Sequence, residues 1–313
     1  MTLSEGAGRI PVVIDCDPGV DDALAILLAA SRRDVLELLA VTTVAGNAGI
    51  DETTRNAGAV LSLTGCDDIP LYRGAHRPLM RAVGRRAPVH GADGLGGETQ
   101  DLRARPADPE KPAWVALCDI VRSRPGAVTL CVLGPMTNVA LAILTDPGFA
   151  ARVREIVFMG GAAFTDGNVT ASAEFNIFVD PHAAQIVMES GIPLTMTGLD
   201  VTRDVVVSRS HIEETWARYS DRAAVFSRMV SCYADGDPAL HDPCVIAWLL
   251  DPSAFTTIRG RICVDCREGP DFGRTVVARR EKHMGPEGPN ATILMRGDVA
   301  RITGMIGRAL EAL

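Results

Sequence analysis

The sequence has few aromatic residues and no long apolar run. Phe, Trp and Tyr make up 4% of its 313 residues. No stretch of 18 or more apolar residues occurs, which excludes a hydrophobic membrane-spanning helix. The first residues also lack the basic and then apolar pattern of a secretory signal. We therefore expect a cytoplasmic protein without a membrane partner.

The sequence also lacks an excess of basic residues and a disulfide framework. Its 31 Lys and Arg against 39 Asp and Glu give a formal net charge of −8 at pH 7, so we expect no nucleic-acid partner. The eight cysteines are scattered, which indicates reduced thiols. Cys263 and Cys266 form an isolated C-x-x-C. Without a second pair, it indicates a strand pattern and not a zinc or redox site.

Strand-like and helix-like patterns alternate along the chain. The hydrophobic content of 47% is ample for a packed core. The alternation predicts an α/β fold with an open, mainly parallel, Rossmann-like sheet and helices on both faces. No linker divides the chain, so we predict one domain over 1–313. The predicted strands are 12–14, 36–43, 69–72, 128–133, 155–159, 192–197 and segments near 261–265, 274–278 and 291–295; the predicted helices are 23–30, 51–64, 113–122, 139–144, 183–190, 244–250 and 299–312.

Two regions depart from this alternation. Residues 73–112, here called the flap, are dense in Arg, Gly and Pro and have no hydrophobic periodicity. A long irregular stretch of this kind indicates a functional loop, so we expect a flexible flap over an active site. His90 is its most chemically versatile residue. The second region, 208–240, is polar and helical, and we expect it to be mobile.

Four carboxylates lie between the first strand and the first helix. They are Asp15, Asp17, Asp21 and Asp22, and a Pro-Gly pair breaks the chain between them. Ligands of open α/β sheets bind at the carboxyl ends of the strands, which is where these acids lie. Clustered carboxylates repel one another unless a positive group joins them. A hard divalent cation with oxygen ligands is the obvious candidate.

Further polar residues follow other strands or open a helix. Asn47 follows the second strand, and a later loop carries Asn168, Glu174 and Asn176. The pair His241-Asp242 opens an apolar helix, as Asp21-Asp22 does. Asp242 is therefore a credible third carboxylate for the same ion.

Six motifs resemble those of the inosine–uridine-type nucleoside hydrolases. The resemblance covers nearly the whole chain, and the motifs occur in the family's order. It implies the nucleoside hydrolase fold. The motifs are 15–22 (DCDPGVDD), 44–47 (VAGN), 90–96 (HGADGLG), 134–138 (GPMTN), 159–180 (MGGAAFTDGNVTASAEFNIFVD) and 241–243 (HDP).

The resemblance implies one Ca²⁺ and a set of residues around it. Asp17, Asp22 and Asp242 would be its side-chain ligands, and Leu133 would contribute its backbone carbonyl. The other residues that it implies bind the substrate. Asp21 and Asn176 would hold the ribose hydroxyls, with Asn47 near the 2′ side, and Asn168 and Glu174 would take the 3′ and 5′ region. Met159 belongs to the same set, His90 would close over the base, and Tyr233 and Arg228 could line the base side.

The resemblance implies hydrolysis of a nucleoside to ribose and free base. Asp17 would accept the proton of the attacking water, and His241 would protonate the leaving base. A histidine at position 241 resembles members that accept uridine and other pyrimidine nucleosides, or both base types. Family members form homodimers and homotetramers. Because Glu174 lies among carboxylates, we expect like-charge repulsion to exclude nucleoside monophosphates.

Two other functions would use part of this pattern. In a haloacid-dehalogenase-like phosphatase, Asp15 would be the nucleophile, Asp17 the acid and Mg²⁺ the ion. That class predicts a Thr or Val soon after the second Asp, whereas Pro18 and Gly19 follow here. The second alternative is a non-catalytic nucleoside-binding protein. Asp17 and His241 argue against it, since neither is needed merely to bind ribose.

Overall fold

The computed structural model describes residues 8–82, 88–91, 93–98, 102–234 and 236–313. Residues 1–7, 83–87, 92, 99–101 and 235 lie outside this set. Parts of the predicted flap and of the predicted 208–240 region therefore fall outside the described residues. Among the helices described, none combines the length and apolar character needed to cross a membrane.

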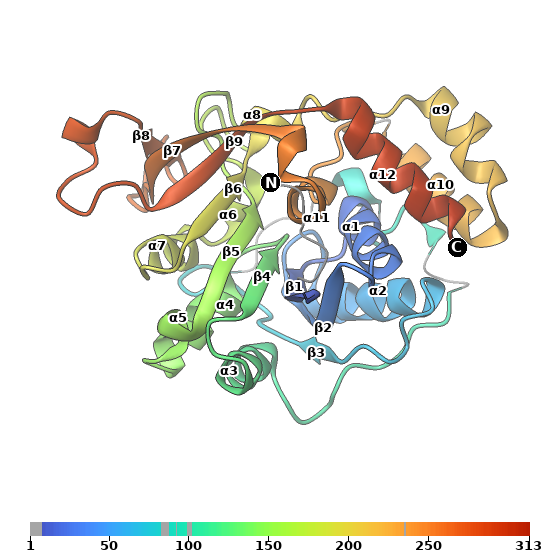
Figure 1. Cartoon of the computed structure of the whole chain (residues 1–313), viewed down its shortest axis with the longest axis horizontal. Coiled ribbons are helices and arrows are strands. Elements are labelled where there is room, and N and C mark those ends of the chain that lie inside the picture. The colour runs from blue at the N-terminus through green and yellow to red at the C-terminus, as the bar shows by residue number, and fades with distance from the viewer. Residues whose placement is uncertain (1–7, 83–87, 92, 99–101, 235) are drawn as a thin grey trace.

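One nine-stranded sheet runs through the molecule in the order β3-β2-β1-β4-β5-β6-β9-β7-β8 (Figure 1). All neighbours from β3 to β9 pair in parallel, and β7 is antiparallel to both β9 and β8. The strands are β1 (Ile10–Cys16), β2 (Leu36–Thr43), β3 (Leu71–Arg73), β4 (Val128–Val132), β5 (Val153–Met159), β6 (Leu194–Thr197), β7 (Phe255–Val264), β8 (Thr275–Ala278) and β9 (Ala291–Gly297).

Helices cover both faces of the sheet. Val12 and Ile14 of β1 pack into one core and Val13 into the other, because successive side chains of a strand point to opposite faces. The first core packs under α1 (Val20–Ser31), α2 (Ile50–Leu63), α10 (Asp221–Tyr233), α11 (Pro243–Leu250) and α12 (Val299–Glu311). The second packs under α3 (Ala113–Ser123), α4 (Thr137–Thr145), α5 (Phe149–Arg152) and α7 (Pro181–Met188).

The predicted α/β class, with a mainly parallel sheet and helices on both faces, is confirmed. Several boundaries differ from those predicted. β7 begins at Phe255 and not near 261, and β3 spans 71–73 and not 69–72. Several short helical segments were not predicted; they include α6 (Phe175–Val179), α8 (Leu199–Thr202), η1 (Pro88–His90), η4 (Pro252–Ala254) and η5 (Glu281–His283). Two others, α9 (Arg209–Glu214) and η3 (Trp216–Arg218), lie in the region 208–240, which was predicted as helical.

Candidate active site

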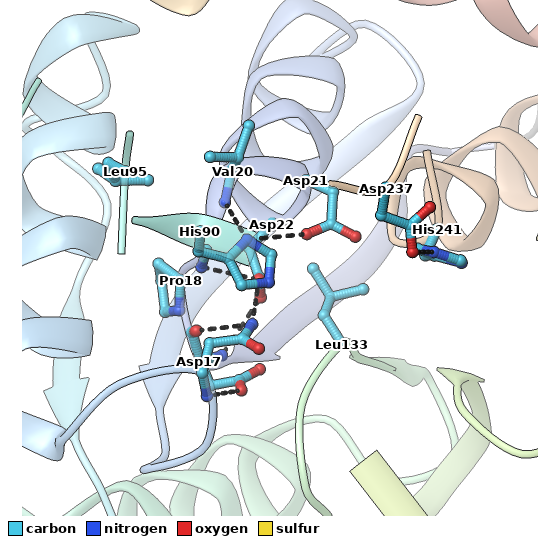
Figure 2. Close-up of polar contacts among 12 residues, drawn as sticks. Asp17, Pro18, Val20, Asp21, Asp22, His90, Leu95, Leu133, Asp237 and His241 are labelled. Carbon is cyan, nitrogen blue, oxygen red and sulfur yellow. Dashed lines mark hydrogen bonds and ion pairs between the residues drawn. The ribbon is translucent and has the colours of Figure 1, made fainter. Parts of the chain in front are cut away.

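The carboxyl ends of three adjacent parallel strands converge on one point. Asp17 directly follows β1, Asn47 lies in the turn after β2, and Leu133 directly follows β4. β1 lies between β2 and β4 in the sheet, so these turns are neighbours in space. Figure 2 shows Asp17 below the start of α1, with Leu133 beside the same group of side chains.

The carboxylate of Asp17 fills a tight space between two glycines. A Cβ atom added at Gly46 or Gly134 would collide with it, so both turns require glycine for this close approach. Asp17 is 0% exposed, and its Oδ2 accepts the backbone N–H of Asn47 at 2.6 Å. Its Oδ1 is buried and has no hydrogen-bond partner among the described residues. Burial and the charge of Asp22 raise the pKa of Asp17 well above its usual value.

Three more carboxylates meet beside Asp17. At the start of α1, Asp22 accepts the N–H of Gly19 at 2.9 Å, as an acidic residue in a first helical turn commonly does. Asp21, Asp22 and Asp242 each offer an oxygen, and these three oxygens lie within 4.8 Å of one another. Burial and the charge of Asp21 raise the pKa of Asp22 to about 7. Burial and the neighbouring carboxylates also raise the pKa of Asp242.

This donor set fits a hard divalent cation. Its side-chain donors are carboxylate oxygens, which Ca²⁺ and Mg²⁺ prefer. The unpartnered Oδ1 of Asp17 and the crowded carboxylates both need a positive partner. The structure groups Asp21, and not Asp17, with Asp22 and Asp242. Since the resemblance assigns Asp17 to the metal and Asp21 to ribose, those two roles stay predictions.

A second wall is built from the segment after β5. Asn176 donates from Nδ2 to the carbonyl oxygens of Leu133 at 2.6 Å and Met159 at 3.2 Å. Glu174 is buried as the N-cap of α6, and its carboxylate accepts backbone N–H groups, including those of Asn176 and Gly161, each at 2.9 Å. Burial raises the pKa of Glu174, and these hydrogen bonds oppose the rise. Asn168 is exposed and accepts the N–H of Phe175.

His90 of the flap packs directly onto the start of α1. Its Nδ1 accepts the N–H of Val20 at 3.2 Å and lies 4.0 Å from Oδ1 of Asp21. Its ring stacks on Tyr233 of α10, with centroids 5.0 Å apart and an interplanar angle of 15°. Burial lowers the pKa of His90, so the ring is a neutral group against an acidic site at neutral pH.

Both ring nitrogens of His241 are engaged. Nδ1 lies 2.7 Å from the hydroxyl of Thr202, and Nε2 lies 3.1 Å from Oδ2 of Asp237. Burial alone would lower the pKa of His241. The hydrogen bond to Asp237 and the charges of Asp21, Asp237 and Glu174 outweigh burial and raise it.

These side chains surround one cavity of about 950 Å³. It is large enough for a small-molecule ligand. Acidic and amide groups line one part of it, and the rings of His90 and Tyr233 line another. A pocket with an acidic floor and ring-lined walls can bind a ligand that has both hydroxyl groups and a flat ring.

Comparisons with known proteins agree with this geometry. The family model described as "Inosine-uridine preferring nucleoside hydrolase" matches residues 12–303. The pyrimidine-specific ribonucleoside hydrolase RihA of Shewanella woodyi is 40% identical over 320 residues, which cover 96% of this chain and 98% of that protein.

The chain belongs to the inosine-uridine preferring nucleoside hydrolase family.

Solved structures of nucleoside hydrolases share its fold. The plant nucleoside hydrolase PpNRh1 has a TM-score of 0.89 and 32% identity, with 98% of this chain and 100% of that one covered. A purine-preferring ribonucleoside hydrolase from Gardnerella vaginalis has a TM-score of 0.88 and 29% identity, with 96% and 98% covered. The predictions of this family, of its fold and of an enzyme of the ribonucleoside hydrolase class are confirmed, and the phosphatase alternative is wrong.

The nucleoside hydrolase cavity brings together most residues singled out from the sequence. All of the predicted site residues line it except Asp17 and Asp22, which are 0% exposed and accept hydrogen bonds from the lining residue Asn47. Tyr233, which was expected on the base side, lines it as well. Arg228 does not, because it lies on the exposed side of α10 and pairs with Glu98 at 2.8 Å.

Sequence reasoning missed three contributors to this nucleoside hydrolase site. Asp237 lines the cavity and holds His241, but both residues lie in the connection between α10 and α11, where an i, i+4 spacing does not predict a contact. Thr202 gave no signal, because it comes from a short helix far away in the chain. Arg81 of the flap lines the cavity with its guanidinium over the rings of Phe178 and Phe272.

The isolated C-x-x-C is not part of any site in the described structure. Cys263 lies in β7 and its thiol donates to the carbonyl of Val276, whereas Cys266 donates to the carbonyl of Pro181. β7 ends at Val264, so the interpretation of the pair as a strand pattern is right for Cys263 and wrong for Cys266. All eight cysteines are free thiols.

Proposed function

We propose that this protein hydrolyses the N-glycosidic bond of ribonucleosides to ribose and free base, with Ca²⁺ as its cofactor. The observation that carries the proposal is the unpartnered, buried Oδ1 of Asp17 beside the carboxylates of Asp21, Asp22 and Asp242. The membership of the chain in the nucleoside hydrolase family supports the same reaction.

The cation would be held by Asp17, Asp22, Asp242 and the backbone carbonyl of Leu133. When bound, it would lower the pKa of a water molecule in the site. Asp17 is proposed as the group that accepts the proton of the attacking water, because its buried carboxylate has one oxygen without a partner. The tight space left by Gly46 and Gly134 fixes this carboxylate in one position.

The sugar would lie over the acidic floor. Asp21, Asn47 and Asn176 are proposed to hold the ribose hydroxyls near the cation, with Asn168, Glu174 and Met159 at the far side of the sugar. Glycosidic cleavage builds positive charge on the sugar ring, and carboxylates already fixed in place stabilise that charge more in the transition state than in the ground state.

The leaving base would lie against His90 and Tyr233. His241 is proposed to protonate the base as it leaves. Its Nε2 is directed at Asp237, so proton delivery to the base requires His241 to exchange this hydrogen bond for one to the substrate. The charges around His241 raise its pKa and so keep it protonated closer to neutral pH.

Pyrimidine nucleosides such as uridine are proposed as preferred substrates, with a base-nonspecific activity as the alternative. The first is supported by the similarity to pyrimidine-specific RihA, and the second by the structural likeness to a purine-preferring enzyme. We further propose a homodimer or homotetramer in the cytoplasm. The free thiols of all eight cysteines support the proposed cytoplasmic location.

The test is ribose release by the purified protein from uridine, cytidine, inosine and adenosine. It is run before and after calcium is stripped with a chelator, and again after calcium is restored. We expect release that depends on calcium. No release from any nucleoside in the presence of calcium would contradict the proposal and favour a protein that only binds nucleosides.

A further inference from the structure

We propose that Asp237 selects the leaving base, and that its carboxylate favours bases with an exocyclic amino group over bases with a carbonyl oxygen in that place. Cytidine would then be preferred to uridine, and adenosine to inosine. This inference rests on the proposed nucleoside hydrolase function and concerns the part of the cavity that receives the base.

Asp237 lies in the connection between α10 and α11 and contributes to the cavity wall. It is flanked there by Gly236 and is close to His241, and the ring of Tyr233 lines the same wall. Its side chain is 32% exposed, whereas that of His241 is 7% exposed. Figure 2 shows the Asp237 carboxylate against His241. A ligand in the cavity can therefore reach the carboxylate of Asp237 more readily than the ring nitrogens of His241.

The Asp237 carboxylate is fixed in place yet keeps free acceptor capacity. Oδ1 accepts the N–H of Ala239 at 3.1 Å, and Oδ2 accepts from Nε2 of His241 at 3.1 Å. Burial tends to raise the pKa of Asp237, but the hydrogen bond and charge of His241 hold it below its usual value. An ionised carboxylate is an acceptor only, and each oxygen can take a second donor.

An acceptor-only group distinguishes the two kinds of base edge. The amino group of cytosine or adenine donates hydrogen bonds. Uracil and hypoxanthine carry a carbonyl oxygen at the corresponding position, and two acceptors facing each other repel. A site that offers an acceptor disfavours a base that also presents only an acceptor there, because the two oxygens cannot pair with each other. Other carboxylates of the cavity, such as Asp21 and Asp242, belong to the floor.

The test is kcat/KM for cytidine and for uridine in the wild-type protein and in Asp237→Asn. The amide offers N–H donors that can pair with the uracil carbonyl, so we expect the cytidine/uridine ratio to fall by about tenfold or more. Asp237→Ala, which offers neither group, should give an intermediate ratio. Asp221→Asn makes the same chemical change at an exposed position of α10 and should leave the ratio unchanged.

An equal loss of activity on both nucleosides in Asp237→Asn would overturn the inference, because it would mean that Asp237 only holds His241 in place. An unchanged ratio would also overturn it. Calorimetric binding of cytidine and uridine supplies the same ratio without turnover. If the wild-type protein binds both but releases no ribose, the proposed function fails while the binding ratio still decides the role of Asp237. Binding of neither nucleoside would overturn both proposals.

Discussion

The carboxylate of Asp17 is tightly constrained between Gly46 and Gly134. Asp17→Asn keeps its size, and the amide oxygen can still accept the N–H of Asn47. The variant cannot take up the proton of a water molecule. We expect the fold to persist and kcat for uridine to fall by about 10²–10⁴-fold. Circular dichroism checks the fold, and Asp221→Asn is the matched control. Near-wild-type turnover would remove Asp17 from the proposed role.

The proposed role of His241 as the acid can be tested with substrates whose leaving groups differ. A pyrimidine is a poor leaving group unless it is protonated, whereas nitrophenolate leaves readily without help. His241→Ala should therefore reduce kcat on uridine far more than on nitrophenyl riboside, by about 10²-fold or more. The ratio of the two rates is the measurement. An equal loss on both substrates would mean that His241 does not act as the acid.

The buried carboxylate of Glu174 is expected to make the site select nucleosides over nucleotides. It is 2% exposed and its oxygens are held by backbone N–H groups. A 5′-phosphate near it would meet like charge, so we expect hydrolysis of uridine monophosphate to be at least tenfold slower than that of uridine. The guanidinium of Arg81 lines the same cavity but lies over two phenylalanine rings. Equal rates on the two substrates would show that Arg81 or solvent outweighs the repulsion.

At the scale of elements, the contact between the flap and the start of α1 depends on Gly19. Its backbone angles, φ −96° and ψ −166°, suit alanine as well as glycine. A Cβ there would lie 2.6 Å from Nδ1 of His90. The ring would have to leave Tyr233 and the N–H of Val20. We expect Gly19→Ala to raise KM for uridine about tenfold, from the loss of this stacking.

The control for this contact is a double-mutant cycle with His90→Ala. If Gly19→Ala acts through the His90 ring, it should have little further effect once the ring is gone. Gly8→Ala places a methyl group where none of the described residues has an atom within 4 Å, so it should leave KM unchanged. The same KM increase in both backgrounds would mean that the effect comes from the α1 turn itself.

Sequence patterns predicted the regular elements well where one signal dominated. β2 matches its predicted span because a largely apolar segment, LELLAVTT, ends at a turn. α6 was missed because Glu174 was interpreted only as a substrate-binding residue. In the structure, Glu174 lines the cavity and is also the N-cap of this short helix. β7 was predicted to start too late because Arg259 and Gly260 interrupt its pattern, and its pairing with β9 compensates for them.

The candidate site was also predicted only in part from the sequence. Residues such as Asp22 and Asn176 were found because they belong to long motifs, in which the spacing of the polar residues predicts a functional site. Asp237 was missed because its neighbour Pro238 favours interpretation as an ordinary turn. Thr202 could not have been found, since only the tertiary fold brings it to His241.

At the scale of the whole molecule, the strand order creates the site. β1 lies between β2 and β4, so turns that are far apart in the chain meet around Asp17. Asp242 reaches the same point from the start of α11, which packs against α1. Local sequence patterns do not fix this order, because any two buried parallel strands could be neighbours. The fold therefore concentrates buried negative charge, and its stability must depend on what neutralises that charge.

This dependence predicts a link between calcium, pH and stability. In the folded protein, the pKa values of Asp17, Asp22 and Asp242 are raised, that of Asp22 to about 7. Unfolded aspartates ionise near pH 4. Without metal, the unfolded chain therefore holds fewer protons than the folded one between these pH values. Stability from these groups is fully present below about pH 4 and is lost as pH rises through about 7.

Calcium binds only the ionised carboxylates, so it should restore stability most at high pH. We expect the rise in Tm on adding calcium to chelator-treated protein to be larger near pH 8 than near pH 5. At a hundredfold excess over Kd, the gain is about 2.7 kcal/mol. Asp22→Asn should reduce the pH dependence, while Asp221→Asn should retain it. Differential scanning calorimetry measures both, and an equal calcium effect at the two pH values would place the ion away from these carboxylates.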